Sequence, residues 1–254
     1  MQNGPMRLSD MTQSFWQGVV YGPPGCGKTS FATISKLSTF ILDVDIGVNT
    51  TMARRRKLGM ALDNVFVWKI QTVGDYDAAI DWLVAKGNIR YFQLVVIDSA
   101  TELQRIIIKE TADKTKHMTP EQRDWGIIRT VMENTTVMLR YLPCNLIYTC
   151  HEIQKFDPTV GNLCWRPSFD GRFAFEYAKH FSFICRLIAR AGPTGQVDAN
   201  NNQIMGVQRV LDFGPDPLIH YKDRSSAMNR YEWPVLDDIL ARMVASTHGE
   251  PVKP

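Results

Sequence analysis

Short apolar runs, separated by polar, glycine- or proline-containing segments, recur along most of the chain and predict buried strands. Between several of these runs, apolar residues return at helical spacing, which predicts amphipathic crossover helices. Strands that alternate with helices in this way are typical of an α/β fold with a mostly parallel central sheet flanked by helices. The predicted strands are residues 15–21, 39–45, 65–70, 92–98, 145–149, 181–188 and 204–213.

The remaining segments connect or extend this framework. The last two runs are joined by a hairpin-like connection at residues 191–203, which predicts an antiparallel C-terminal extension of the sheet. Residues 111–120 are polar and residues 153–171 lose periodicity, so both predict loops. We expect helices over 30–37, 172–179 and 235–244, a loose arm over 1–13 and a frayed tail over 246–254. No internal repeat or shift in composition divides the chain, which predicts one domain over residues 1–254.

Composition favours a soluble globular protein in a reducing compartment. Of the 254 residues, 44% are hydrophobic and 22% are charged. No apolar run reaches the ~18 residues that a membrane span needs, and the N-terminus has no apolar signal region. The five cysteines form no C-x-x-C pair and are odd in number, so we expect no disulfide framework and a cytoplasmic location.

The net charge is only +3, so any affinity for nucleic acid must come from locally clustered cations. Residues 54–57 are one such cluster, Arg-Arg-Arg-Lys. They are either a contact to nucleic-acid phosphate or a solvated helix face.

The strongest motif is the loop Gly22-Pro-Pro-Gly-Cys-Gly-Lys-Thr29, which fits the pattern G-x-x-x-x-G-K-[ST]. A predicted strand precedes it and a predicted helix follows, which is the arrangement that a phosphate-binding loop needs. Glycines let consecutive backbone N–H groups turn towards an anion, and the start of the helix adds the positive end of its dipole. Lys28 is then expected to reach the β- and γ-phosphates, and the Thr29 hydroxyl to ligate Mg²⁺.

Acidic residues end two of the predicted strands, at the edge where parallel sheets bind ligands. Asp98 ends an apolar strand in the Walker B pattern, so it is expected to hold Mg²⁺ opposite Thr29. Asp43 and Asp45 lie at the tip of another strand, and we expect only one of them to reach a nucleotide. Either could instead cap the next loop. Glu102, one helical turn after Asp98, either points back into the site or is a first-turn acid favoured by the helix dipole.

Two further features follow the strand at 145–149. His151, just beyond its tip, is placed to sense a γ-phosphate, although a single histidine is often structural. The segment behind it combines cations with aromatic side chains, which suits single-stranded nucleic acid because bases stack on such rings at ~1–3 kcal/mol each. The alternative is a loop whose aromatic residues pack into the core. The expected DNA-binding residues are Lys155, Phe156, Trp165, Arg166, Phe169 and Arg172.

The order of these parts resembles the RecA-like ATPase core over roughly residues 15–225. Within that group the chain looks most similar to short phage recombinases of the Sak type, which are single-strand annealing proteins. The closer likeness rests on Val-Ile-Asp-Ser-Ala-Thr-Glu-Leu (96–103), Tyr-Thr-Cys-His-Glu (148–152) and Lys-Asp-Arg (222–224). The resemblance implies a RecA-like P-loop ATPase using ATP and Mg²⁺, in the host cytoplasm if a phage encodes it. The implied nucleotide-binding residues are Gly22, Pro23, Pro24, Gly25, Cys26, Gly27, Lys28, Thr29 and Ser30, with Thr29 and Asp98 serving the metal.

The same resemblance implies roles for other residues. Asp45 stands where RecA-like enzymes commonly have a glutamate that positions the attacking water; being one methylene shorter, it implies a closer water or slower hydrolysis. His151 takes the sensor position. Lys222 and Arg224 resemble the basic pair that reaches the γ-phosphate of a neighbouring subunit, which implies a homo-oligomer, either a ring or a helical filament. Residues 111–124 and 153–172 take the places of two DNA-binding loops.

Three functions from different classes remain open. The first is an ATP-driven protein that binds single-stranded DNA in homologous recombination or strand annealing, with a single-strand-binding protein as a further partner. The second is a P-loop kinase for a nucleotide or metabolite, although the chain has no compact arginine-rich lid segment. The third is a nucleotide-gated loader or adaptor that barely hydrolyses, which the shorter Asp45 keeps open. A signalling GTPase is disfavoured, because no Asn-Lys-x-Asp segment is present.

Overall fold

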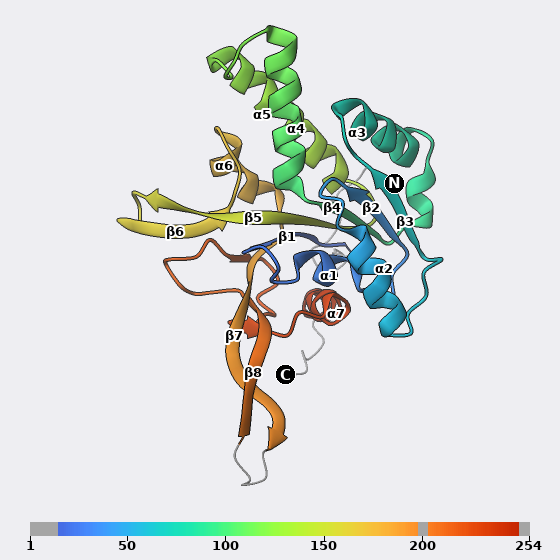
Figure 1. Cartoon of the computed structure of the whole chain (residues 1–254), viewed down its shortest axis with the longest axis vertical. Helices are drawn as coiled ribbons and strands as arrows, with labels where there is room; N and C mark the ends of the chain where they lie inside the picture. The colour runs from blue at the N-terminus through green and yellow to red at the C-terminus, as the bar shows by residue number, and fades with distance from the viewer. Residues whose placement is uncertain (1–14, 198–202, 249–254) are drawn as a thin grey trace.

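A computed structural model describes residues 15–197 and 203–248 of the protein (Figure 1). Its main strands in chain order are β1 (Gln17–Gly22), β2 (Thr39–Asp43), β3 (Val65–Lys69), β4 (Leu94–Asp98), β5 (Asn145–Asp157), β6 (Asn162–Pro167), β7 (Phe183–Val197) and β8 (Gln203–Asp212). Two short strands follow, β9 (Lys222–Asp223) and β10 (Tyr231–Glu232). The helices are α1 (Lys28–Thr33), α2 (Val48–Lys57), α3 (Val73–Ile80), α4 (Ala100–Thr115), α5 (Gln122–Arg140), α6 (Phe173–Glu176) and α7 (Leu236–Thr247), with short π- or 3₁₀-helical turns at Asp81–Ala85, Asn88–Tyr91 and Tyr177–His180.

The strands form a single sheet with the order β10-β8-β7-β1-β5-β4-β2-β3, to which β6 adds on β5 and β9 on β7. The neighbours from β7 to β3 in this order all pair parallel. The pairs β7–β8, β8–β10 and β5–β6 are antiparallel. The predicted α/β fold, with a mostly parallel sheet and antiparallel C-terminal strands, is confirmed.

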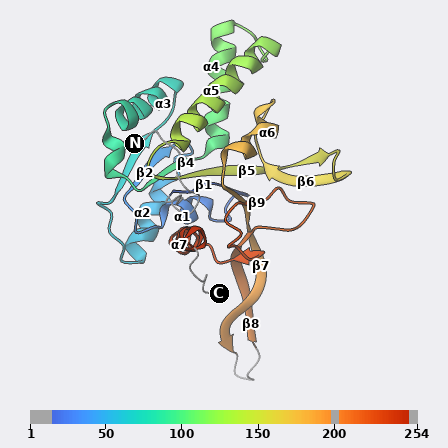
Figure 2. The same cartoon turned by 180° about the vertical axis from the view of Figure 1, so that it is seen from behind.

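Side chains of the central strands are buried on both faces of the sheet, which explains their continuous apolar runs. On one face, Val19, Tyr21, Val95 and Ile97 pack in a cluster with residues of α3, α4, α5 and α6. On the other face, Val20, Leu94 and Val96 pack with α1 and α7. Figures 1 and 2 show these two groups of helices on opposite sides of the sheet.

The parallel register brings the carboxyl ends of three strands together at one edge. Gly22 at the end of β1 is level with His151 in β5, and Asp43 at the end of β2 is level with Asp98 at the end of β4. The chain leaves β1 there to form the glycine loop. This edge therefore collects the glycine loop, Asp43, Asp98 and His151.

Several element boundaries differ from the predictions. The segment after residue 152 is a hairpin and not an irregular loop, because β5 continues to Asp157 and pairs with β6. A backbone ladder of this kind needs no apolar periodicity, so the pattern did not reveal it. The helix α1 ends at Thr33, α4 continues to Thr115, and α7 continues to Thr247. The expected tail is thus helical over 246–247; the arm at 1–13 and residues 249–254 lie outside the described residues.

All five cysteines lie in the described part of the chain, and each is a buried free thiol. None of the helices described is long and apolar enough to cross a membrane.

Candidate functional site

The loop between β1 and α1 depends on three glycines for its shape. Gly25 and Gly27 have φ angles of 74° and 105°, in the left-handed region that favours glycine. A Cβ atom at Gly22 would lie 2.3 Å from the carbonyl oxygen of Leu187 in β7, so no larger residue fits between the two strands. The backbone conformation at Gly25 and Gly27 is therefore encoded by the motif itself, whereas the requirement at Gly22 comes from the neighbouring strand β7.

The loop borders a cavity of about 340 Å³ at the carboxyl edge of the sheet. Lys28 is only 8% exposed, and its ammonium group donates hydrogen bonds to the carbonyl oxygens of Gly22 (2.9 Å) and Pro23 (3.0 Å). The other residues that line the cavity are Pro24, Gly25, Gly27, Thr29, Ser30, Asp45, Thr50, Arg54, Asp98, Ser99, Thr149, His151 and Arg209.

Asp98 and Thr29 meet at one corner of this cavity. Asp98 is 2% exposed; its Oδ1 accepts a hydrogen bond from the Thr149 hydroxyl, and its buried Oδ2 has no hydrogen-bond partner among the described residues. A Cβ atom at Gly47 would lie 3.2 Å from this Oδ2 and 3.5 Å from the Thr29 hydroxyl oxygen. The absence of a side chain at Gly47 thus leaves a space that both oxygens border.

This corner has the chemistry of a magnesium site. Burial raises the pKa of Asp98, and the nearby Thr149 and Thr29 hydroxyls oppose that shift. A buried carboxylate oxygen without a partner is costly unless a cation or donor reaches it. Mg²⁺ prefers such oxygens, and with one carboxylate and one hydroxyl it would take its remaining ligands from water and phosphate. Asp98 and Thr29 are therefore the residues that fit Mg²⁺.

The two acids after β2 have different positions. Asp43 is buried at the end of the strand, and its Oδ1 accepts a hydrogen bond from the backbone N–H of Gly47 (3.0 Å). Burial raises the pKa of Asp43. Asp45 is exposed and lines the cavity. Of the two acids, Asp45 lines the cavity and Asp43 holds the following loop.

His151 lines the cavity from the strand beside β1. Its backbone N–H donates to the Thr101 hydroxyl (3.1 Å), and its ring Nε2 lies 3.3 Å from the Glu102 carboxylate. Glu102 also pairs with Arg105 one helical turn further along α4. Glu102 is thus a first-turn acid of α4 that contacts the histidine of the site but is not among the described residues that line the cavity.

Two arginines in the cavity were not predicted as site residues. Arg209 comes from β8, and its Nε donates to the loop carbonyl of Cys26 (2.8 Å). Arg54 comes from α2 and donates to the Ser30 hydroxyl (3.3 Å). Only the basic run at 54–57 pointed to Arg54, and nothing local in the sequence pointed to Arg209, which the pairing of β8 with β7 places here.

The same basic run contains a residue with a purely structural contact pattern. Arg55 is 1% exposed, and its guanidinium donates to the carbonyl oxygens of Thr33, Ser35 and Ala61 and to the Asn64 side chain. Consecutive arginines on α2 therefore differ: Arg54 faces the cavity, and Arg55 ties α2 to the chain around α1.

The residues expected to contact DNA divide into an exposed and a buried group. Phe156 is 61% exposed near the tip of the β5–β6 hairpin, and the Arg172 side chain, paired with Glu176, is also largely exposed. Lys155 is partly exposed, donates to the Phe169 carbonyl oxygen (3.1 Å) and lies 3.7 Å from the Asp170 carboxylate. These three side chains remain available for a contact with nucleic acid.

The buried group corrects the prediction. Phe169 is fully buried and packs edge-on against Phe173, 5.0 Å between ring centroids. Arg166 is buried and pairs with Asp157 (2.9 Å), and Trp165 is half-buried with the Arg186 guanidinium 4.3 Å from its ring. For Phe169, Arg166 and Trp165 the alternative, packing into the protein, is the one observed.

Lys222 and Arg224 lie away from the cavity of their own chain. Lys222 pairs with Ile184 near the start of β7, and its ammonium donates to the carbonyl oxygen of Ala178. Arg224 is exposed and lies 3.5 Å from the carbonyl oxygen of Lys179. Neither residue lines the glycine-loop cavity, so any contact of theirs with a nucleotide would be with a neighbouring subunit.

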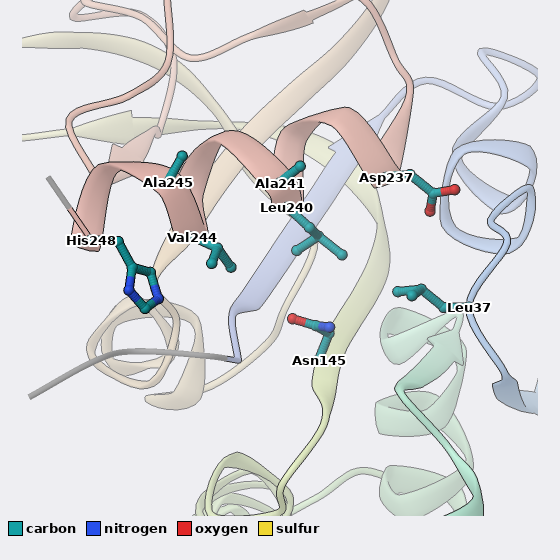
Figure 3. Close-up of a pocket in the computed structure, with 8 residues that line it drawn as sticks. All are labelled: Leu37, Asn145, Asp237, Leu240, Ala241, Val244, Ala245 and His248. Atoms are coloured by element: carbon teal, nitrogen blue, oxygen red, sulfur yellow. The ribbon is translucent and has the colours of Figure 1, made fainter. Parts of the chain in front are cut away.

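A cavity of about 520 Å³ lies at the opposite edge of the sheet, against α7 (Figure 3). Figure 3 shows Leu240 and Val244 of α7 on the side of the helix that faces Leu37 and Asn145, which stand at the amino ends of β2 and β5. Its Asp237 is already bonded to Ser35 and Lys36. Among the described residues this lining is mainly apolar and contains no lysine or arginine, whereas Lys28, Arg54 and Arg209 line the glycine-loop cavity.

The glycine loop on a parallel sheet, with a buried carboxylate beside its threonine, defines a P-loop nucleotide-binding protein. A family model described as an AAA domain matches residues 14–225, and the chain belongs to that family. Its members are P-loop ATPases, so nucleotide binding and hydrolysis is the class of activity of this chain. A comparison with curated proteins found no match. The closer likeness to phage recombinases stays a prediction.

Proposed function

We propose that the protein is a Mg²⁺-dependent ATPase that binds single-stranded DNA and acts in homologous recombination or strand annealing. The observation that supports this most directly is the course of β5. The strand carries His151 at the cavity and Phe156, largely exposed, on the hairpin beyond it. At about 3.3 Å per residue, the two are about 17 Å apart along one continuous strand. A change at the cavity can therefore be passed directly to the surface proposed to bind DNA.

In this proposal four residues of the cavity have defined roles in hydrolysis. Lys28 exchanges its bonds to loop carbonyls for bonds to phosphate oxygens, which its position among them allows. Thr29 and Asp98 hold Mg²⁺, which neutralises phosphate charge when bound. Asp45 is the exposed carboxylate of the cavity, so it orients the attacking water and accepts its proton.

His151 acts as the sensor. Its ring is already held by Glu102, and its backbone is held by Thr101. A phosphate within reach of the ring competes with the Glu102 carboxylate for the same imidazole. Loss of that phosphate returns the ring to Glu102 and thereby changes the contacts at the base of the β5–β6 hairpin.

We also propose that the protein forms a homo-oligomer in which Lys222 and Arg224 serve a neighbour's nucleotide. The support is that both lie off their own cavity and that burial lowers the pKa of Lys222 to about 8. Burial disfavours the positive charge of this ammonium, so a contact with a negatively charged phosphate would stabilise it. A head-to-tail interface of this kind produces a ring or a filament.

A nucleotide-gated loader or adaptor with slow hydrolysis is the second candidate. The observation that favours it is that the acid facing the cavity is Asp45, whose side chain is shorter than that of glutamate. The kinase alternative finds no comparable support, because the chain after residue 183 is mainly strands and α7 in its described part.

The proposal is tested by measuring ATP hydrolysis with and without single-stranded DNA, together with a gel-shift assay. We expect stimulation by DNA, a shift that depends on ATP, and loss of hydrolysis when EDTA removes Mg²⁺. DNA binding without turnover would favour the loader. If DNA neither stimulated hydrolysis nor shifted in the gel, the assignment to DNA would be contradicted.

A further inference from the structure

A second, smaller cavity adjoins the glycine-loop cavity. Its volume is about 200 Å³, and it shares Gly27, Ser30, Arg54 and Arg209 with the first. The rest of its wall is apolar: Phe31, Ile34, Leu58, Leu187, Pro234 and Val235. Figure 1 shows that α1, α2 and α7, which carry or flank most of these residues, lie side by side below the sheet.

The shared residues define a direction along the site. Asp98, Thr149 and His151 line only the first cavity, so the metal and the terminal phosphate belong at that end. Ser30 and the two arginines stand at the junction. A triphosphate that starts at Asp98 and runs along the loop past Ser30 would direct the rest of its molecule into the apolar cavity.

We propose that this second cavity binds the nucleobase and ribose, while Arg54 and Arg209 at the junction hold the inner phosphates. The inference rests on the proposed binding of ATP by the glycine loop. Apolar walls suit the faces of a base, and guanidinium groups suit both phosphate oxygens and the plane of a base. Leu58 and Val235 are half-exposed at the rim, so one edge of the base stays in contact with water.

Arg209 is positioned by the loop that it serves. Its Nε is bonded to the Cys26 carbonyl oxygen (2.8 Å), and its Cδ would lie 3.3 Å from a Cβ atom at Gly27. The side chain thus lies over Gly27, and a larger residue there would displace it. Since Arg209 belongs to β8, it connects the junction to the β7–β8 hairpin.

The test compares ATP with inorganic tripolyphosphate, which has the phosphates but no nucleoside, by isothermal titration calorimetry. The variant Leu58→Ala/Val235→Ala removes two walls at the rim, where truncation leaves the core intact. We expect about tenfold weaker binding of ATP and unchanged binding of tripolyphosphate. The matched control Met52→Ala/Leu62→Ala truncates two exposed apolar residues outside both cavities and is expected to bind both ligands as the parent protein does.

Unchanged binding of ATP by the rim variant would overturn the inference. Failure of the proposed function has a different signature, namely that the parent protein binds neither ligand or that Lys28→Ala alters neither affinity. Photolabelling of the parent protein with 8-azido-ATP supplies a second measurement that needs no variant. Label in peptides that contain Ile34, Leu58 or Val235 supports the inference, and label confined to other peptides overturns it.

Discussion

Two hairpins in the described part of the chain begin from the two strands that flank β1. Both β5 and β7 pair parallel with β1, run beyond the edge where the glycine loop lies, and turn back as β6 and β8 (Figure 1). The β5–β6 hairpin sends His151 into the cavity from its outgoing strand, whereas the β7–β8 hairpin sends Arg209 from its returning strand. Both hairpins therefore contribute a side chain to the cavity beside the glycine loop.

The hairpins differ in how their side chains are used. In the β5–β6 hairpin and the segment after it, Arg166 is committed to an ion pair and Phe169 to the core, so its basic and aromatic composition overstates its free surface. In the β7–β8 hairpin Arg209 reaches the cavity, although no motif or charge cluster around it in the sequence pointed to it. The lesson is that register and burial decide which residues can act, and that composition alone does not.

The largest expected effect concerns the buried side chains of the β5–β6 hairpin and the segment after it. Phe169→Ala removes a fully buried ring that packs with Phe173 and Tyr177, and should lower the free energy of unfolding by about 3–5 kcal/mol. Urea denaturation measures this loss. The control Phe175→Ala, at a highly exposed ring, should change stability by no more than about 0.5 kcal/mol. Equal costs for the two variants would show that Phe169 is not a core residue.

The second hairpin is tested through its arginine. Arg209→Ala should lower kcat/KM for ATP about 10- to 100-fold, because a hydrogen bond to a charged group is worth about 1.5–3 kcal/mol. Arg190→Ala is the matched control, since Arg190 lies on the same hairpin and stacks on Tyr231 outside the cavity. A steady-state ATPase assay gives both values. If the two variants behaved alike, the contact of Arg209 with the loop would have no role in turnover.

The exposed end of the first hairpin should matter for DNA and not for the fold. Phe156→Ala should weaken binding of single-stranded DNA about tenfold, within the ~1–3 kcal/mol range of a lost base stack. Fluorescence anisotropy with a labelled oligonucleotide measures it. Tyr141→Ala removes an exposed ring elsewhere and should leave affinity unchanged. Wild-type affinity in the Phe156 variant would exclude this hairpin as the DNA contact.

The smallest effect is a pH dependence at the base of the β5–β6 hairpin. His220, whose backbone N–H is bonded to the Trp165 carbonyl, has its pKa lowered to about 4, mainly by burial. The unfolded chain binds a proton below about 6.5 and the folded chain does not, so stability falls as pH drops from about 6.5 to about 4. At pH 5.5 the loss is about 1 kcal/mol. Urea denaturation at pH 7 and 5.5 measures the loss of stability in the parent protein and in His220→Gln. The loss should be smaller in the variant by about 1 kcal/mol. An equal loss in both proteins would contradict the role of His220.

The sequence alone was sufficient for the features that depend on neighbours along the chain. The glycine loop was predictable because Gly25 and Gly27 dictate their own backbone conformation, and Asp98 because an apolar strand ending in an acid is a local pattern. The contact of Arg209 with the loop was not predictable, since it depends on the register between β7 and β8. The burial of Phe169 was not predictable either, since a segment without periodicity does not reveal which side faces the core.

The central claim is that the glycine loop binds the phosphates of a nucleotide and that Lys28 carries much of that binding. Isothermal titration calorimetry of Mg-ATP into the parent protein and into Lys28→Ala tests it directly. The expected result is a loss of affinity of about tenfold or more, since a charge-assisted bond to phosphate is worth about 1.5–3 kcal/mol. Equal affinities in the two proteins would contradict the account.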